Sequence, residues 1–293
     1  MKIAAWQYPI EHLASFDAWR AKLAAGIADA AARGARVCVM PEYAAMELTC
    51  LLDRDAQANL ATQVIALQEL LPDYLAAYAD AARTHRIAIV GGSFPERIGD
   101  RYHNRLRVHG PSGSATIVDK LQMTRFEREL WGIAPGSAQA VVELGPLRLG
   151  IAICYDAEFP LIVRRLVEAG ANAIAVPSCT DTLAGYHRVR VAAQARALEN
   201  QCYVIQAPTV GLAPWSIAVD ENVGSAGVFA PPDRGFPPTG VVALGPLSES
   251  HLLIADLDLA LVDAARADGA VLGHADWSLP AHLAGTTITT TRA

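Results

Sequence analysis

The chain has 293 residues, of which 52% are hydrophobic and 18% are charged. A chain of this length and apolar content can bury a sizeable core, which excludes bulk disorder. Its 24 Lys and Arg residues against 30 Asp and Glu residues give a net charge of −6. No basic run offsets that balance, so it argues against a general nucleic-acid binder.

The cysteine content and the start of the chain bear on where in the cell the protein is expected. Five cysteines, an odd number without a C-x-x-C pair, do not suit a disulfide framework. The first apolar stretch stops at Gln7, which is too short for the apolar region of a signal peptide. No run approaches the ~20 apolar residues of a membrane helix. We therefore expect a cytoplasmic protein with reduced thiols and no membrane association.

Short β-rich apolar runs alternate with longer segments rich in Ala and Leu, which predicts an α/β protein. The expected strands are residues 3–7, 37–40, 87–91, 106–109, 116–119, 141–144, 149–153, 173–176, 203–206, 227–230, 241–244 and 252–257. The expected helices are residues 16–32, 55–71, 74–84, 161–169 and 186–199. Pro72 is expected to end or kink the second helix. Without a linker between two halves, we expect one domain over residues 1–265 and a C-terminal extension of it over residues 266–293.

Two charged residues stand directly beyond expected strands. Glu42 follows the strand 37–40, and Lys120 follows the strand 116–119. Reactive groups in open α/β sheets gather beyond the carboxyl ends of strands. Taken alone, a glutamate there is more often an exposed loop carboxylate, and a lysine is ordinarily a solvated surface group.

A third strand end carries Cys154, which precedes the polar pair Tyr155-Asp156. A cysteine between strand and helix suits a nucleophile, although most free cysteines simply pack in the core. Together, a carboxylate, an ammonium and a thiol at three strand ends supply what amide cleavage needs: a proton acceptor, oxyanion stabilisation and a nucleophile.

In these motifs the sequence resembles the nitrilase superfamily of carbon–nitrogen hydrolases, over roughly residues 1–260. The motifs that carry the resemblance are Pro41-Glu42, Asp119-Lys120, Cys154-Tyr155-Asp156, Pro177-Ser178-Cys179, the first strand 3–7 and the segment 196–204. The resemblance implies an α-β-β-α sandwich with two central sheets, in a homodimer or higher homo-oligomer. It implies no cofactor and no metal.

The family also has a second, structural glutamate between the lysine and a Pro-Gly. Counting back from Pro135-Gly136 gives Glu129 as our choice for that role, with Glu127 two residues earlier as the alternative. Its implied task is to hold Lys120 charged and correctly oriented.

The resemblance implies that Cys154 attacks a carbonyl carbon and forms a thioester. Lys120 and the backbone N–H of Tyr155 would stabilise the oxyanion, and Glu42 would carry the proton. Two alternatives remain open: acyl transfer from the same thioester to an amine, and a catalytically idle small-molecule binding protein on this fold.

The substrate stays open among small amides, carbamoyl compounds and nitriles, because two positions depart from better-known branches. Gln122 stands where many branches of the family have a histidine, and Glu158 stands where many amidases have an arginine. Glu158 is either a favourable acid in a first helical turn or a cavity residue that selects neutral or cationic substrates. Cys179 is expected to border the same cavity. His187 is either a cavity residue or an exposed helical one.

Overall fold

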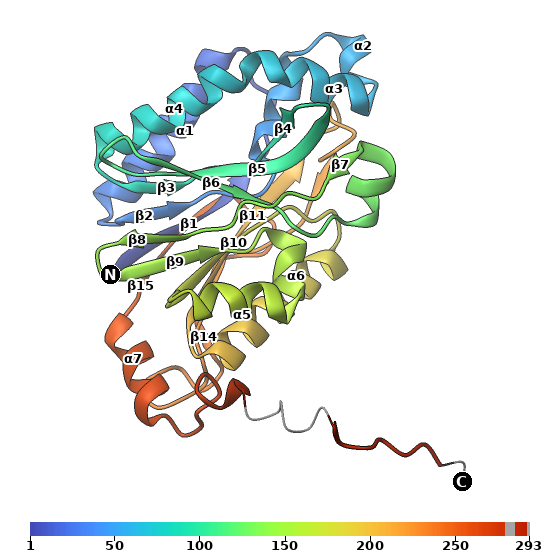
Figure 1. Ribbon diagram of the computed structural model, residues 1–293. Helices are drawn as coiled ribbons and strands as arrows, with labels where there is room; N and C mark the ends of the chain where they lie inside the picture. The colour runs from blue at the N-terminus through green and yellow to red at the C-terminus, as the bar shows by residue number, and fades with distance from the viewer. Residues whose placement is uncertain (279–284, 292–293) are drawn as a thin grey trace.

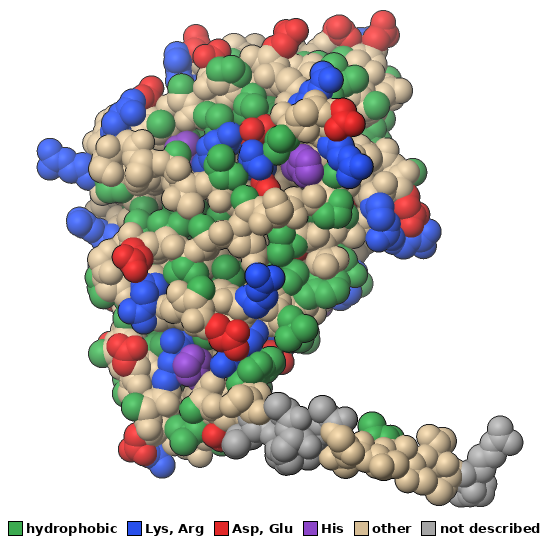
Figure 2. Space-filling model, in the orientation of Figure 1, with side chains coloured by type: hydrophobic (Ala, Val, Ile, Leu, Met, Phe, Trp, Pro, Cys, Tyr) green, Lys and Arg blue, Asp and Glu red, His purple; other side chains and the backbone are tan. Residues whose placement is uncertain are grey.

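The structure is a computed structural model that describes residues 1–278 and 285–291 (Figure 1). Two groups of strands lie face to face in the middle of the molecule, and helices cover the outer face of each (Figure 1). Of the expected C-terminal extension, residues 279–284 and 292–293 lie outside the described residues. On the face seen in Figure 2, basic side chains are interspersed with acidic ones.

The first sheet is built around the parallel strands β1, β2 and β3. Ile3 of β1 pairs with Val37 of β2, which in turn pairs with Ala88 of β3, while β15 runs antiparallel along the other side of β1. The strands of this sheet are β1 (Lys2–Pro9), β2 (Val37–Val39), β3 (Ala88–Val90), β4 (Phe94–Ile98), β5 (Arg101–His109), β6 (Ala115–Asp119), β7 (Ile133–Ala134) and β15 (His251–Asp256).

The second sheet is built around the parallel strands β9, β10 and β11, with β8 and β13 antiparallel to their neighbours. It meets the first sheet where Tyr8 of β1 pairs with Thr209 of β11. Its strands are β8 (Val141–Leu144), β9 (Leu147–Ile151), β10 (Ala173–Ser178), β11 (Tyr203–Leu212), β13 (Gly227–Phe229) and β14 (Val241–Leu244), and the short β12 (Glu221–Asn222) pairs with the end of β11.

Side-chain alternation along the strands separates two apolar cores. In β1, Ile3 and Ala5 point into the core between the two sheets, whereas Ala4 and Trp6 point into the core under the helices of the first sheet. Strands with two covered faces need apolar residues at successive positions. This is why β1 reads as a continuous apolar run rather than an alternating one.

Helices α1 (Phe16–Ala32) and α4 (Leu71–His85) cover the first sheet, and the ring of Trp19 stacks on Tyr74 with centroids 4.9 Å apart. Helices α5 (Pro160–Glu168) and α6 (Leu183–Asn200) cover the second sheet (Figure 1). The expected α-β-β-α arrangement is therefore confirmed. A further helix, α7 (Leu259–Asp268), follows β15. None of the helices within residues 1–278 and 285–291 is both long and apolar enough to cross a membrane.

The expected helix over residues 55–71 is wrong in its extent. The structure has α2 (Arg54–Gln57), α3 (Leu60–Leu67) and a 3₁₀ turn (Gln68–Leu70) in its place. The Asn59 side chain starts α3 by accepting a hydrogen bond from the backbone N–H of Thr62 at 3.1 Å. Pro72 neither ends nor kinks a helix. It lies in the first turn of α4, where its missing N–H needs no partner.

Candidate active site

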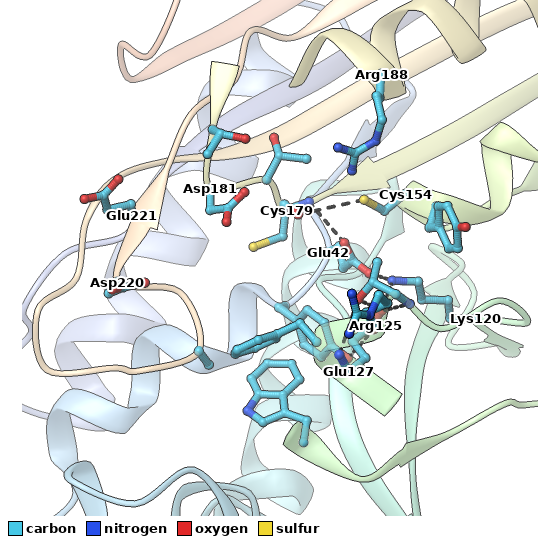
Figure 3. A pocket seen from close by; sticks show the side chains of 18 of the residues that line it. Glu42, Lys120, Arg125, Glu127, Cys154, Cys179, Asp181, Arg188, Asp220 and Glu221 are labelled. Atoms are coloured by element: carbon cyan, nitrogen blue, oxygen red, sulfur yellow. Dashed lines mark hydrogen bonds and ion pairs between the residues drawn. The ribbon is translucent and has the colours of Figure 1, made fainter. Parts of the chain in front are cut away.

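Three strand ends bring Glu42, Lys120 and Cys154 to one cavity of about 470 Å³ (Figure 3). Glu42 lies three residues after β2, Lys120 directly after β6, and Cys154 three residues after β9. The first two belong to strands of the first sheet and the third to the second sheet. The structure therefore places together the three residues that the sequence singled out.

Cys154 begins a short 3₁₀ segment, η4 (Cys154–Glu158), with a φ of 50°. A residue with a side chain is strained in this left-handed region, at a cost on the order of 1–2 kcal/mol. Only 4% of Cys154 is exposed, and its Sγ lies 3.8 Å from the carbonyl oxygen of Cys179. Burial and the nearby Glu42 carboxylate raise the pKa of the Cys154 thiol well above its usual value, although Lys120 opposes them. The resting side chain is therefore a neutral thiol.

Lys120 is 1% exposed and lies between two carboxylates. Its Nζ is 2.7 Å from Oε1 of Glu42 and 2.6 Å from Oε2 of Glu127. Burial alone would lower the pKa of Lys120, but the charges of Glu127 and Glu42 outweigh it and raise that pKa well above the usual value. The lysine is thus held as an ammonium inside the protein.

Glu42 is fully enclosed and accepts hydrogen bonds through both carboxylate oxygens. Besides Lys120, Oε1 accepts from Nδ2 of Asn104 at 2.9 Å, and Oε2 accepts from the backbone N–H of Cys179 at 3.1 Å. Burial, joined by repulsion from Glu127, raises the pKa of Glu42 even though Lys120 pulls it down. A carboxylate with a raised pKa is suited to accept and return a proton near neutral pH.

The choice of Glu129 as the second glutamate is wrong, because Glu127 occupies that place. Oε1 of Glu127 accepts hydrogen bonds from Tyr43 at 2.7 Å and Asn104 at 3.2 Å. Burial would raise the pKa of Glu127, but the charge of Lys120 and the hydrogen bonds from Lys120, Tyr43 and Thr124 hold it below the usual value. Glu129 instead lies on the surface and pairs with Arg125 at 3.0 Å.

A local pattern could have distinguished the two glutamates. Thr124 stands three residues before Glu127, the spacing of a capping box. In the structure the two residues bond reciprocally. The backbone N–H of Thr124 donates to Oε2 of Glu127 at 2.9 Å, and the backbone N–H of Glu127 donates to Oγ1 of Thr124 at 3.3 Å. Asn104, which bridges the two glutamates, was also missed, and no sequence pattern marks it.

The remaining predicted cavity residues divide into two groups. Tyr155, Glu158 and Cys179 line the cavity, but Glu158 is paired there with Arg188 at 3.3 Å. His187 does not line it. It is exposed on the outer side of α6, because the helical repeat turns it away from the cavity while Arg188 faces inward.

The segment that follows β11, up to the start of β12, completes the cavity with acidic side chains. Asp220 and Glu221 line the wall opposite Cys154, next to Asp181 (Figure 3). Within the described part of the chain, none of these three carboxylates takes part in an ion pair. Among residues 1–278 and 285–291, no group of three or more His, Cys, Asp or Glu side chains is placed to hold a metal ion.

Comparison with known proteins places this geometry in a family. The carbon-nitrogen hydrolase family model matches residues 2–267. A probable hydrolase, YhcX, from Bacillus subtilis is 32% identical over 272 residues, which cover 92% of this chain and 52% of the relative. The chloroplastic omega-amidase of Arabidopsis thaliana is 26% identical, covering 82% of this chain and 63% of the relative. The chain thus spans about half to two thirds of these relatives' length.

Solved structures with low sequence identity share the fold. The amidase of the nitrilase superfamily from Nesterenkonia sp. AN1 is 22% identical with a TM-score of 0.64, covering 94% of this chain and 97% of that one. A carbon-nitrogen hydrolase from Helicobacter pylori is 17% identical with a TM-score of 0.72, covering 91% and 92%. Because the family model matches most of its length, the chain belongs to the carbon-nitrogen hydrolase family.

Proposed function

We propose that this protein is an amidase-type hydrolase that cleaves a carbon–nitrogen bond of a small molecule through a thioester on Cys154. The observation that carries the proposal is the buried cluster of Cys154, Lys120 and Glu42 in one cavity of a carbon-nitrogen hydrolase chain. In this proposal Glu127 is the structural glutamate that keeps Lys120 charged.

The first step is attack on the carbonyl carbon. Because the resting thiol is neutral, the S–H proton passes to Glu42 as the S–C bond forms. The carbonyl π electrons move to oxygen, and the oxyanion is stabilised by Lys120 and by the backbone N–H of Tyr155. One oxyanion donor is typically worth about 3–4 kcal/mol of the barrier.

The second half returns the enzyme to its starting state. Glu42 gives its proton to the departing nitrogen, the C–N bond breaks and an amine leaves. Glu42 then takes a proton from water as the water oxygen bonds to the thioester carbon. When this second intermediate collapses, the C–S bond breaks, the carboxylic acid leaves and the proton returns to sulfur.

The two glutamates have different tasks because their environments differ. Glu127 accepts hydrogen bonds from Lys120, Tyr43, Asn104 and Thr124, which keeps its pKa low and its charge fixed. Glu42 accepts hydrogen bonds from fewer donors and has a raised pKa, so it can both accept and release a proton. Carboxyl groups whose environments push their pKa values apart are a general basis for dividing roles.

The cavity favours a neutral or cationic small molecule over an anionic one. Arg188 is offset by Glu158, and Arg125 by Glu129, whereas Asp181 and the two acids after β11 have no ion-pair partner among the described residues. The selection against anionic substrates that the sequence suggested for Glu158 is therefore assigned to the unpaired acids on the opposite wall of the cavity. The volume of about 470 Å³ suits a small metabolite rather than a folded polypeptide.

The proposal is tested by a panel of small amides, carbamoyl compounds and nitriles, with Cys154→Ala as the control for background hydrolysis. Release of ammonia or an amine that depends on Cys154 supports it. Product analysis with an added amine separates hydrolysis from acyl transfer. In acyl transfer the added amine is joined to the acyl group, whereas hydrolysis gives the carboxylic acid. Tight binding of a panel compound without turnover would favour the idle binding protein instead.

A further inference from the structure

The segment that carries the nucleophile also carries a buried carboxylate that does not line the cavity. Asp156 is 0% exposed and lies two residues after Cys154 in η4. Its Oδ1 accepts hydrogen bonds from the backbone N–H groups of Gln122 at 2.7 Å and Leu121 at 3.1 Å, and its Oδ2 also accepts from Leu121 at 3.1 Å. These are the two residues that directly follow Lys120.

These contacts join two segments that reach the site from different sheets. Lys120 follows β6 of the first sheet, and its own backbone is tied to Asn104 and Gly136, each by a 2.9 Å hydrogen bond. Cys154 follows β9 of the second sheet. Among the hydrogen bonds of residues 1–278 and 285–291, only those of Asp156 connect the segment of Lys120 with that of Cys154.

We infer that Asp156 is a positioning residue that fixes Lys120 relative to Cys154 across the two sheets. The inference rests on the proposed function, in which the lysine stabilises the charge that develops when the thiol attacks. Misplacing a catalytic group by about 1 Å can cost on the order of 100-fold in rate. A clamp made of three hydrogen bonds to backbone N–H groups is well suited to prevent that displacement.

The oxygen atoms of Asp156, rather than its charge, perform this task. Asp156 forms no ion pair among the described residues, and the charges that shift its pKa are those of Lys120 and Glu42. Burial raises the pKa of Asp156 to about 7, although the N–H groups of Leu121 and Gln122 pull it down. Oδ1 accepts from both N–H groups, so an asparagine oxygen at the same position can keep one contact to each; only the second, shared contact from Leu121 to Oδ2 is lost.

The experiment compares Asp156→Leu, which has a similar size but no acceptor, with Asp156→Asn. Two probes report on Cys154: the rate of its alkylation by iodoacetamide, followed by mass spectrometry, and the burst of 4-nitrophenolate from 4-nitrophenyl acetate. We expect Asp156→Leu to lower both rates about 10- to 100-fold while the protein stays folded by circular dichroism. Asp156→Asn should stay within about threefold of wild type. An Asn variant slowed 10-fold or more relative to wild type would overturn the assignment, and this comparison with wild type holds even if Asp156→Leu fails to fold.

A second comparison distinguishes positioning of Lys120 from general damage. If Asp156 acts through Lys120, then Asp156→Leu should change the alkylation rate less than about twofold in a Lys120→Met background. An equal loss in both backgrounds would show a structural role only and would overturn the inference. If Cys154 of the wild-type protein reacted with neither probe, that result would overturn the proposed function as well as this inference. A reactive wild type with an unaffected Leu variant would overturn this inference alone.

Discussion

Replacing Glu127 with Gln should remove most of the activity, because every partner of this carboxylate is a donor. Oε1 accepts from Tyr43 and Asn104, and Oε2 accepts from Lys120 and from the backbone and side chain of Thr124. In either orientation, the amide NH₂ group of a glutamine would face at least two donors. Lys120 would also lose one of its two counter-charges.

The structure sets the scale of this effect. The 2.6 Å between Nζ of Lys120 and Oε2 of Glu127 corresponds to roughly 6 kcal/mol of attraction at an effective dielectric of about 20, before desolvation. Glu42 still pairs with Lys120, so only part of this attraction is lost. Losing one correctly placed oxyanion donor costs about 3–4 kcal/mol, which lowers kcat roughly 100- to 1,000-fold. Unpaired buried donors should lower the free energy of unfolding by about 1–3 kcal/mol.

Glu129→Gln is the matched control, since it makes the same chemical change two residues away on the surface. The assay is steady-state hydrolysis of the best amide from the panel, with urea unfolding measured in parallel. Glu129→Gln should keep wild-type kcat and stability. Equal losses in the two variants, or a Glu127→Gln variant with near wild-type turnover, would refute the assignment.

Three further predictions concern reactivity, pH and assembly. Cys154 should be the most reactive of the five thiols toward brief iodoacetamide treatment, with Cys179 as the one cavity-lining competitor; preferential labelling of any other cysteine would contradict this. Because Asp156 has a pKa of about 7 in the folded protein, above its ordinary 3.8, the folded state binds the proton more tightly. Unfolding free energy should therefore fall as pH rises from about 4 to 7, and Asp156→Asn should gain up to about 4 kcal/mol relative to wild type over that range by urea unfolding; parallel pH profiles would argue against it. The protein should sediment as at least a dimer at micromolar concentration, and a monomer in the ultracentrifuge would refute the assembly that the family resemblance implies.

Local sequence patterns predicted the parts of the fold in which one signal dominates. The apolar run at Ile3–Gln7 and the Ala-rich segment Phe16–Ala32 correspond to β1 and α1. Prediction failed where short elements depend on distant partners. β4 contains Pro95 and the charged Glu96, and it is held by antiparallel pairing with β5 rather than by its own composition.

In the candidate site, too, some residues could be predicted from the local sequence and others depend on distant partners. Glu42, Lys120 and Cys154 each follow a strand, so their convergence could be expected from topology. Counting back from Pro135-Gly136 does not identify the second glutamate, because a fixed spacing does not tell which of two nearby carboxylates is buried; the capping-box spacing of Thr124 and Glu127 does mark it. The contacts of Asn104 and Asp156 link segments distant in sequence, and neither position carries a local signal.

The central claim is that Cys154 carries an acyl group during turnover. The most direct test is intact-protein and peptide mass spectrometry of Glu42→Gln after prolonged exposure to 4-nitrophenyl acetate. This ester is activated and its leaving group needs no proton from the enzyme, so the thiol can attack slowly with its proton passing to water instead of to Glu42. Without Glu42 to activate water, hydrolysis of the thioester should be slow, so one acetyl group should accumulate on the peptide that contains Cys154 and be absent from the Glu42→Gln/Cys154→Ala protein. Acetylation at another residue, or none at Cys154 while wild type turns over amides, would contradict the account.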